Sequence, residues 1–265
     1  MSTLLFSKYQ GTGNDFLIGD NREGSYTFLT AEQIQRICDR RLGIGADGLI
    51  LLESATDADF LMRYFNADGQ PGSFCGNGAR CITEFAFRAG LIQQTCTFLA
   101  TDGLHRAQRE ENGTISLLIQ PVTALYEHAD GQFVDTGSPH LVVPVTELDH
   151  LDVATEGRSI RNTERYRSKG VNVNFVQRTE EAQTIRVRTY ERGVENETYS
   201  CGTGAVAAAL CCAEKMTGKQ QITVLTKGGT LQVRFKKEEA GYAEIWLCGP
   251  ATYVFETTLD ITQMT

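Results

Sequence analysis

The chain contains the phrase Cys75-Gly-Asn-Gly-Ala79 in its first half and the phrase Cys201-Gly-Thr-Gly-Ala205 in its second half. A cysteine before a Gly-rich turn and small helix-forming residues is typical of a helix N-terminus, where N–H groups and the helix dipole favour a thiolate. A free cysteine is more often a buried apolar residue. Because the thiol and the glycine recur together, the two copies instead predict a pair of reactive cysteines that act on one substrate.

Other segments repeat at a similar spacing of about 125 residues and in the same order, which is the signature of an internal duplication. The matched segments are Thr12–Ile18 with Thr136–Val142, Gly45–Ile50 with Gly170–Phe175, and Arg63–Asn66 with Arg188–Glu191. We therefore expect two similar halves related by a pseudo-twofold axis, 1–121 carrying Cys75 and 122–252 carrying Cys201, with a site between them.

Composition excludes several classes of function. The 265 residues carry a net charge of −8, and an acidic surface is unsuited to phosphate backbones, so we expect no nucleic-acid partner. We also expect no membrane partner, because no apolar run approaches the roughly 20 residues that span a bilayer. No secretory signal is evident, which favours a cytoplasmic protein with reduced cysteines. The eight cysteines include no Cys-x-x-Cys pair, so we expect no metal site.

Local patterns predict an α/β fold. Strands at 6–9 and 16–19 flank a Gly-rich turn at 11–14. Thr30 and Gln33 form a capping-box pattern before a helix. The apolar positions at helical spacing are Ile34, Ile37, Cys38 and Leu42.

Two further helices should follow the cysteines. The first runs for about 15 residues from Cys75 to near Gly90. The second, Ala205–Met216, is almost entirely apolar or small, so we expect it to be buried on all sides by a sheet that wraps around it. A helical region is also predicted near 147–154. Further strands are predicted at 49–52, 60–65, 141–145, 171–177, 184–190, 221–225, 230–235 and 243–247, with a hairpin turn at 111–113.

Paired cysteines suit one kind of reaction in particular. Inverting the α-carbon of an amino acid requires a base on one face and an acid on the other. A thiol has a reference pKa of about 8.5, so thiolate and thiol are both accessible near neutral pH. Backbone N–H groups of the two Gly-rich turns, at Gly76, Asn77, Gly202 and Thr203, could bind the substrate carboxylate as negative charge develops on it.

Over nearly its whole length the chain resembles the diaminopimelate epimerase family. The motifs that carry the resemblance are Gly13-Asn-Asp-Phe16, Gly43-Ile-Gly-Ala-Asp47, Phe65-Asn-Ala-Asp-Gly69, Cys75-Gly-Asn-Gly-Ala-Arg-Cys81, Pro139-His140, Tyr190-Glu-Arg-Gly193 and Cys201-Gly-Thr-Gly-Ala205. The resemblance implies interconversion of LL- and meso-2,6-diaminopimelate, with no pyridoxal phosphate or metal cofactor. It also implies two α/β halves, each a mixed sheet curled around a central helix. By the same resemblance 253–265 returns to the first half, and a homodimer is possible.

The resemblance further implies roles for individual residues. Cys75 and Cys201 match the acid/base pair, and His140 with Glu191 would tune it. The implied substrate contacts are Asn14, Asn66, Gly76, Asn77, Asn172, Glu191, Arg192, Gly202 and Thr203. Arg192 can pair with a distal carboxylate and Glu191 with a distal ammonium group.

Two positions depart from the pattern of the family. Ser138 stands where many members have a substrate-contacting asparagine, so one hydrogen bond is lost or passes through water. Gly48 stands where some members have a glutamine. These changes question substrate affinity more than the type of reaction.

Other functions remain as alternatives. A proline racemase of the same fold also uses two cysteines, but the Tyr190-Glu-Arg-Gly193 phrase favours the epimerase. A thiol redox protein would be expected to carry Cys-x-x-Cys. A cysteine phosphatase needs five residues between cysteine and arginine, whereas four separate Cys75 from Arg80.

Overall fold

The computed structural model describes residues 3–213 and 216–263, and it contains two compact units. The first unit comprises Met1–Leu117 and Pro250–Thr265, and the second comprises Leu118–Gly249. Strands dominate both units, and the described residues include four α-helices. The predicted α/β fold class is confirmed.

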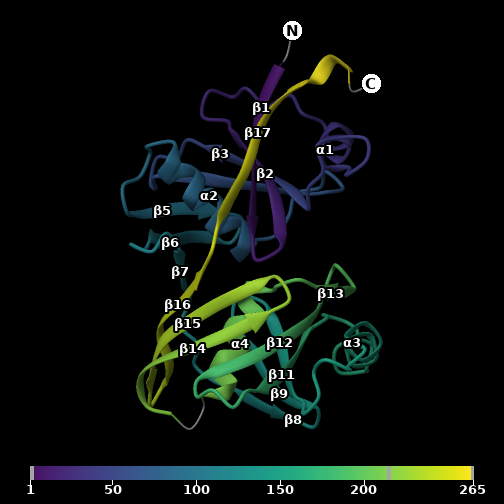
Figure 1. Ribbon diagram of the computed structural model, residues 1–265, viewed down its shortest axis with the longest axis vertical. Coiled ribbons are helices and arrows are strands. Elements are labelled where there is room, and N and C mark those ends of the chain that lie inside the picture. Colours follow the sequence, from purple (N-terminus) through teal and green to yellow (C-terminus); the bar gives the residue numbers. More distant parts are fainter. Residues whose placement is uncertain (1–2, 214–215, 264–265) are drawn as a thin grey trace. The chain divides into compact units, whose positions relative to one another are not determined.

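The first unit is a mixed sheet. Its strands follow the order β17-β1-β2-β3-β4-β5-β6-β7, in which β2–β3 and β4–β5 are parallel pairs and the other neighbours are antiparallel. Figure 1 shows β17, in yellow, running beside the purple β1. The elements are β1 (Thr3–Gly11), β2 (Asn14–Asp20), α1 (Ala31–Cys38), β3 (Gly48–Glu53), β4 (Phe60–Asn66), α2 (Gly76–Arg88), β5 (Thr95–Ala100), β6 (Gly103–Arg109), β7 (Ile115–Ile119), β17 (Thr252–Asp260) and a 3₁₀ turn (Ile261–Gln263).

The second unit repeats this topology. Its order is β8-β9-β10-β11-β12-β14-β15-β16, with β10–β11 and β12–β14 as the parallel pairs and β13 as an extra strand against β12. The elements are β8 (Tyr126–His128), β9 (Gly131–Asp135), β10 (Pro139–Pro144), α3 (Val153–Arg161), β11 (Asn172–Arg178), β12 (Thr184–Glu191), β13 (Asn196–Thr198), α4 (Gly202–Cys212), β14 (Gly218–Thr226), β15 (Gly229–Glu238) and β16 (Gly241–Gly249).

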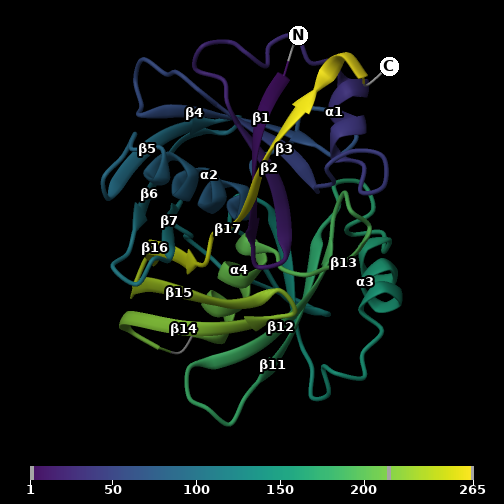
Figure 2. The same ribbon diagram turned by 45° about the horizontal axis from the view of Figure 1, so that its top comes forward.

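Each sheet curls around one helix, as predicted. α2 contacts β1, β2 and β17 as well as β6, which lies far along the order of the same sheet. α4 contacts strands from β9 to β16, and in Figures 1 and 2 strands β14 and β15 run close to it. Nearly every residue of α4 is buried, since Ala, Val, Leu and Cys leave it no polar face.

The outer helices agree with the sequence only in part. Thr30 and Gln33 form the predicted capping box at α1, but this helix ends at Cys38, and Leu42 lies beyond it and is exposed. The prediction of a helix at 147–154 is wrong. Asp152 accepts a hydrogen bond from the backbone N–H of Thr155, so it caps a helix, α3, that begins only at Val153.

Two smaller predictions concern helix ends and hairpins. The helix expected to reach Met216 ends at Cys212 with Ala213 as its C-cap, and residues 214–215 lie outside the described part of the chain. The predicted hairpin at 111–113 is confirmed between β6 and β7.

Candidate active site

Cys75 is the N-cap residue of α2, as the sequence predicts. Its backbone is extended, with φ −121° and ψ 113°, and it leads into the first helical turn at Gly76 and Asn77. The N–H groups of a first helical turn have no acceptor within the helix, and they carry the positive end of its dipole. The half-buried thiol therefore lies where backbone donors gather.

Two predicted binding residues, Asn14 and Asn77, form a chain of polar groups that begins at this thiol. The sulfur of Cys75 lies 3.6 Å from Oδ1 of Asn14, which also accepts a hydrogen bond from Nδ2 of Asn77 at 3.2 Å. The other side of the Asn14 amide donates to Asp47 at 2.6 Å. Asn14 begins β2, so the sheet fixes the position of this amide next to the cysteine.

Arg80 supports this group of polar residues, a role that the sequence patterns did not predict. Its side chain is completely buried, and Nη2 donates to Oδ1 of Asn77 and to the hydroxyl of Thr12, both at 3.1 Å. Nε donates to the carbonyl of Pro250 at 3.3 Å. A buried guanidinium thus orients the Asn77 amide, so that Nδ2 faces Asn14.

Cys201 is the N-cap residue of α4 and has nearly the same backbone angles, φ −111° and ψ 115°. Its sulfur lies 3.7 Å from the hydroxyl of Thr203, and that hydroxyl lies 3.0 Å from Nε2 of His140. Thr136 donates to the backbone carbonyl of Thr203 at 3.0 Å. The histidine therefore reaches Cys201 through one hydroxyl.

Asn174 determines which nitrogen of His140 carries the proton. Its Nδ2 lies 3.1 Å from Nδ1 of His140, while its Oδ1 accepts from the hydroxyl of Thr189. Since the amide nitrogen donates, Nδ1 must accept and Nε2 must carry the hydrogen that faces Thr203. Burial, aided by the charge of Arg192, lowers the pKa of His140 to about 3, so the ring is neutral.

Asn174 was missed because an asparagine within a strand has no distinctive pattern in a single sequence. The one signal in the sequence was the second glycine of the Cys-Gly-x-Gly phrase, Gly204. Gly204 does not have a positive φ, and a Cβ at this position would lie 2.3 Å from Oδ1 of Asn174. The second glycine of the Cys-Gly-x-Gly phrase is therefore required by packing against that amide.

A second polar group surrounds Asn172, which is buried. Its Oδ1 accepts from the backbone N–H of Arg192 at 2.9 Å, and its Nδ2 lies 3.3 Å from the hydroxyl of Ser138. The guanidinium of Arg192 also donates to Ser138 at 3.3 Å. Ser138, one of the two residues that depart from the family pattern, thus contacts both Asn172 and Arg192, which are predicted substrate contacts.

Of the remaining predicted residues, two lie at strand ends and one begins a helix. Glu191 is the last residue of β12, and its Oε2 accepts from the hydroxyl of Thr198 at 2.9 Å. Asn66 is the last residue of β4 and is exposed. Gly202 is buried and begins α4.

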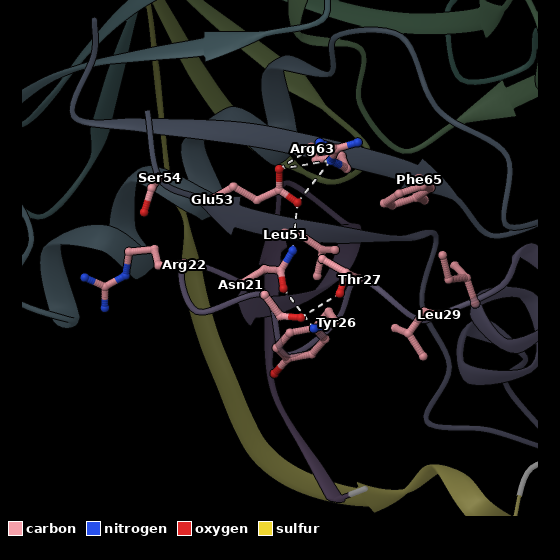
Figure 3. A pocket seen from close by; sticks show the side chains of 12 residues that line it. Asn21, Arg22, Tyr26, Thr27, Leu29, Leu51, Glu53, Ser54, Arg63 and Phe65 are labelled. Carbon is pink, nitrogen blue, oxygen red and sulfur yellow. Dashed lines mark hydrogen bonds and ion pairs between the residues drawn. The ribbon is translucent and has the colours of Figure 1, made fainter. Parts of the chain in front are cut away.

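Figure 3 shows a different hollow, of about 400 Å³, on the face of the first sheet that packs against α1. Asn21 connects two other lining residues, because its Oδ1 accepts a hydrogen bond from the N–H of Tyr26 and its Nδ2 donates one to Glu53 at 2.7 Å. Arg63 pairs with the same carboxylate at 2.9 Å. These polar side chains bind one another, and the lining includes none of the predicted site residues, so we assign the hollow a structural role.

Within 3–213 and 216–263 no helix has the length and apolar character to cross a membrane. In the same ranges no three His, Cys, Asp or Glu side chains gather in a way that could hold a metal ion.

Sequence comparison identifies the family. The family model described as diaminopimelate epimerase matches residues 6–123 and 132–254. The chain belongs to the diaminopimelate epimerase family. It is 48% identical over 255 residues to the diaminopimelate epimerase of Flavobacterium psychrophilum, covering 95% of this chain and 98% of the relative. It is 42% identical over 260 residues to that of Chlorobaculum tepidum, covering 95% and 99%.

Solved structures show the same fold at low sequence identity. A phenazine biosynthesis protein of the PhzF family from Bacillus anthracis superposes with a TM-score of 0.77 at 19% identity, covering 98% of this chain and all of that one. A probable proline racemase from Agrobacterium radiobacter gives 0.65 at 16% identity, covering 97% and 93%. At these identities the likeness supports the fold of this epimerase-family chain and not its substrate.

Proposed function

We infer that this chain is an isomerase that interconverts LL- and meso-diaminopimelate, a step of lysine biosynthesis. Membership of the diaminopimelate epimerase family supports the reaction. The observation that carries the mechanism is the repeated placement of a thiol at the N-terminus of a central helix, Cys75 on α2 and Cys201 on α4.

We propose that the two thiols are the acid and the base. The thiolate of one cysteine removes the α-hydrogen as a proton, and the electron pair of the C–H bond remains on the substrate and delocalises into its carboxylate. The thiol of the other cysteine protonates the opposite face, which inverts the carbon. The first cysteine finishes as thiol and the second as thiolate, so the reverse direction begins from the other state.

Backbone donors at both helix starts suit the developing charge. Gly76 and Asn77 in one unit, and Gly202 and Thr203 in the other, supply N–H groups of the first helical turns. Fixed dipoles stabilise an enediolate-like carboxylate without reorganisation in the transition state. We assign these residues to the carboxylate of the reacting centre.

His140 acts indirectly on Cys201. As a neutral ring it donates from Nε2 to the hydroxyl of Thr203, which leaves that hydroxyl's own hydrogen available to face the sulfur. Such a hydrogen bond stabilises a thiolate more than a thiol, because the acceptor is charged. Glu191 is the other residue predicted to tune the cysteine pair, and its carboxylate accepts a hydrogen bond from the hydroxyl of Thr198. We propose the tuning role for Glu191 as well.

The distal end of the substrate requires groups of both charges, since it carries a second carboxylate and a second ammonium group. We propose Arg192 for the carboxylate, supported by its pairing with Ser138 next to Asn172. Glu191, and the amides of Asn14, Asn66 and Asn172, complete the proposed contacts.

The experiment is solvent exchange with single-cysteine variants. The purified protein, given LL-diaminopimelate in deuterium oxide without added cofactor, should incorporate deuterium at the α-carbon and form the meso isomer. Cys75→Ala and Cys201→Ala should each lower epimerisation by about 10³-fold or more, as removal of a general acid or base does. Full epimerisation by either variant would contradict the two-thiol mechanism, and turnover of proline in place of diaminopimelate would contradict the substrate.

We further propose the setting in which the enzyme acts. All eight cysteines are free thiols, which suits the reducing cytoplasm.

A homodimer through the β1–β17 edge of the first unit is supported by exposed apolar side chains at Leu5, Val254 and Phe255. Val254→Lys should convert the dimer to a monomer in sedimentation velocity, and a wild-type monomer would contradict the proposal.

A further inference from the structure

Tyr64 lies between two glycines in the first unit. Its ring occupies the space in which side chains at Gly48 and Gly72 would otherwise stand. A Cβ on Gly48 would lie 2.5 Å from Cε2 and 3.0 Å from the hydroxyl of Tyr64, and a Cβ on Gly72 would lie 2.3 Å from Cδ1. Neither glycine has a positive φ. Packing of the ring, and not backbone conformation, therefore explains glycine at Gly72 and contributes to its presence at Gly48.

Strand register places this ring next to the Cys75 half-site, by which we mean Cys75 and the proposed substrate contacts Asn14, Asn66 and Asn77 of the same unit. Gly48 is opposite Asn66 on the neighbouring antiparallel strand, and Tyr64 precedes Asn66 by two residues, so all three positions face the same side of the sheet. The residue directly opposite Tyr64 is Ile50. The ring therefore leans diagonally toward Gly48 and toward the strand ends.

That side of the sheet is the one covered by α2. A Cβ on Gly78 of this helix would meet Ile50, and the ring of Phe16 makes an edge-on contact with Tyr64 at 5.9 Å between centroids. Phe16 is two residues from Asn14, whose amide contacts Cys75.

The segment that leads to Cys75 also rests on Tyr64. The N–H of Gly72 donates to the carbonyl of Tyr64 at 2.9 Å, and Pro71 forms a bridge with Phe65. A Cβ on Gly72 would lie 3.2 Å from Oδ1 of Asn66, so the ring and this amide flank one point. The ring is only partly buried there.

We propose that the hydroxyl of Tyr64 is a substrate contact, a further specificity-determining residue that supplies from β4 the polar group that Gly48 lacks on β3. The inference rests on the proposed function. The substrate carries a carboxylate and an ammonium group at each end, and a phenol can donate to the first or accept from the second. The two glycines place the hydroxyl at the border of the half-site and hold it with little rotational freedom, which favours affinity.

Tyr64→Phe tests the proposal, because it removes the hydroxyl and keeps the ring between the glycines. We expect KM for diaminopimelate to rise about 2- to 10-fold, the usual loss for one hydrogen bond, with kcat within about twofold. Tyr26→Phe is the matched control, since Tyr26 donates its hydroxyl to the carbonyl of Leu5, away from the cysteine. It should lower the melting temperature and leave KM unchanged.

The outcomes separate two failures. A wild-type protein without activity on diaminopimelate would contradict the proposed function. An active wild type with an unchanged KM in Tyr64→Phe, whether or not the melting temperature falls, would overturn the inference about Tyr64 alone.

Discussion

The hydroxyl of Thr203 connects His140 to Cys201, and a pair of substitutions isolates its role. Thr203→Val keeps the shape of the side chain and removes the hydroxyl, so the sulfur loses its link to the ring. We expect kcat to fall about 10- to 100-fold, the cost of a hydrogen bond to a charged group. Thr203→Ser restores the hydroxyl and should recover most of kcat. Equal activity of the valine and serine variants, measured by epimerisation, would rule out the relay.

The buried neutral state of His140 predicts how stability depends on pH. Its pKa falls from 6.5 to about 3 on folding, so between these values the unfolded chain binds a proton that the folded chain does not. The contribution of His140 is thus complete above pH 6.5 and is lost as pH falls, by about 1.4 kcal/mol per pH unit. Urea unfolding between pH 7 and pH 5 should show a smaller pH slope in His140→Gln than in the wild type.

The exposed His150 supplies the control for this measurement. His150→Gln controls for the exchange of histidine for glutamine itself, because the side chain of His150 is exposed and packs into no core. A wild-type slope in His140→Gln would contradict a buried neutral ring.

At the level of single residues, the sequence predicted positions better than contacts. The motif around Cys75 placed Asn77 in the same turn, and the structure adds that Asn77 bonds Asn14. The supports Arg80 and Asn174 were missed because each bonds residues far along the chain, Arg80 to Pro250 and Asn174 to His140. Only the fold brings such partners together.

The first turns of α2 and α4 look alike but tolerate different changes. A Cβ on Gly78 would meet the ends of two flexible side chains, Ile50 at 2.8 Å and Met62 at 3.2 Å. A Cβ on Gly204 would lie 2.3 Å from the amide oxygen of Asn174, which is held by hydrogen bonds to Thr189 and His140. The second site cannot adapt without breaking its polar network.

These two glycines form a matched pair for mutation. Gly78→Ala should change the free energy of unfolding by less than about 1 kcal/mol, because alanine favours the helix and the neighbours can move. Gly204→Ala should cost about 2 to 3 kcal/mol and should also lower kcat, since Asn174 releases His140. Urea unfolding and epimerisation rates measure both effects. Equal losses in the two variants would contradict the difference between the turns.

At the level of helices and strands, the sequence patterns predicted those features that side chains close together in the sequence determine. The capping box of Thr30 and the buried α4 follow from side chains close in sequence. The helix expected at 147–154 fails because Leu148 lies in a loop and packs into the hydrophobic core of the second unit, and Asp152 offers the stronger start signal. Apolar spacing alone could not distinguish a packed loop from a helix.

At the level of the whole molecule, the duplication is clearer in topology than in sequence. Register pairs Phe16 with Gly48 in one unit and His140 with Asn172 in the other. The sequence alignment set Gly48 against Val173, one residue away. The equivalent of the buried Asn172 is thus Gly48, and the two copies place their polar groups differently around similar cysteines.

The course of the chain through the two units predicts how fragments behave. The second unit is continuous, 118–249, whereas the first needs 250–265 to provide β17. Within this segment β17 pairs with β1 from Thr252 to Asp260, and Tyr253 packs against Tyr9 and Arg88. We therefore expect fragment 118–249 to fold alone, and fragment 1–117 to remain largely unfolded, because an exposed β1 edge and an uncovered core cannot offset the loss of chain entropy.

A synthetic peptide of residues 250–265 supplies the decisive addition. Mixed with fragment 1–117 it should restore strand signal in circular dichroism and a cooperative melt, whose midpoint rises with peptide concentration as linkage requires. A peptide in which Tyr253 is replaced by Ala should bind more weakly, because it loses the contacts with the rings of Tyr9 and the guanidinium of Arg88. A cooperative melt of fragment 1–117 alone, unmoved by the peptide, would show that β17 is dispensable to the first unit.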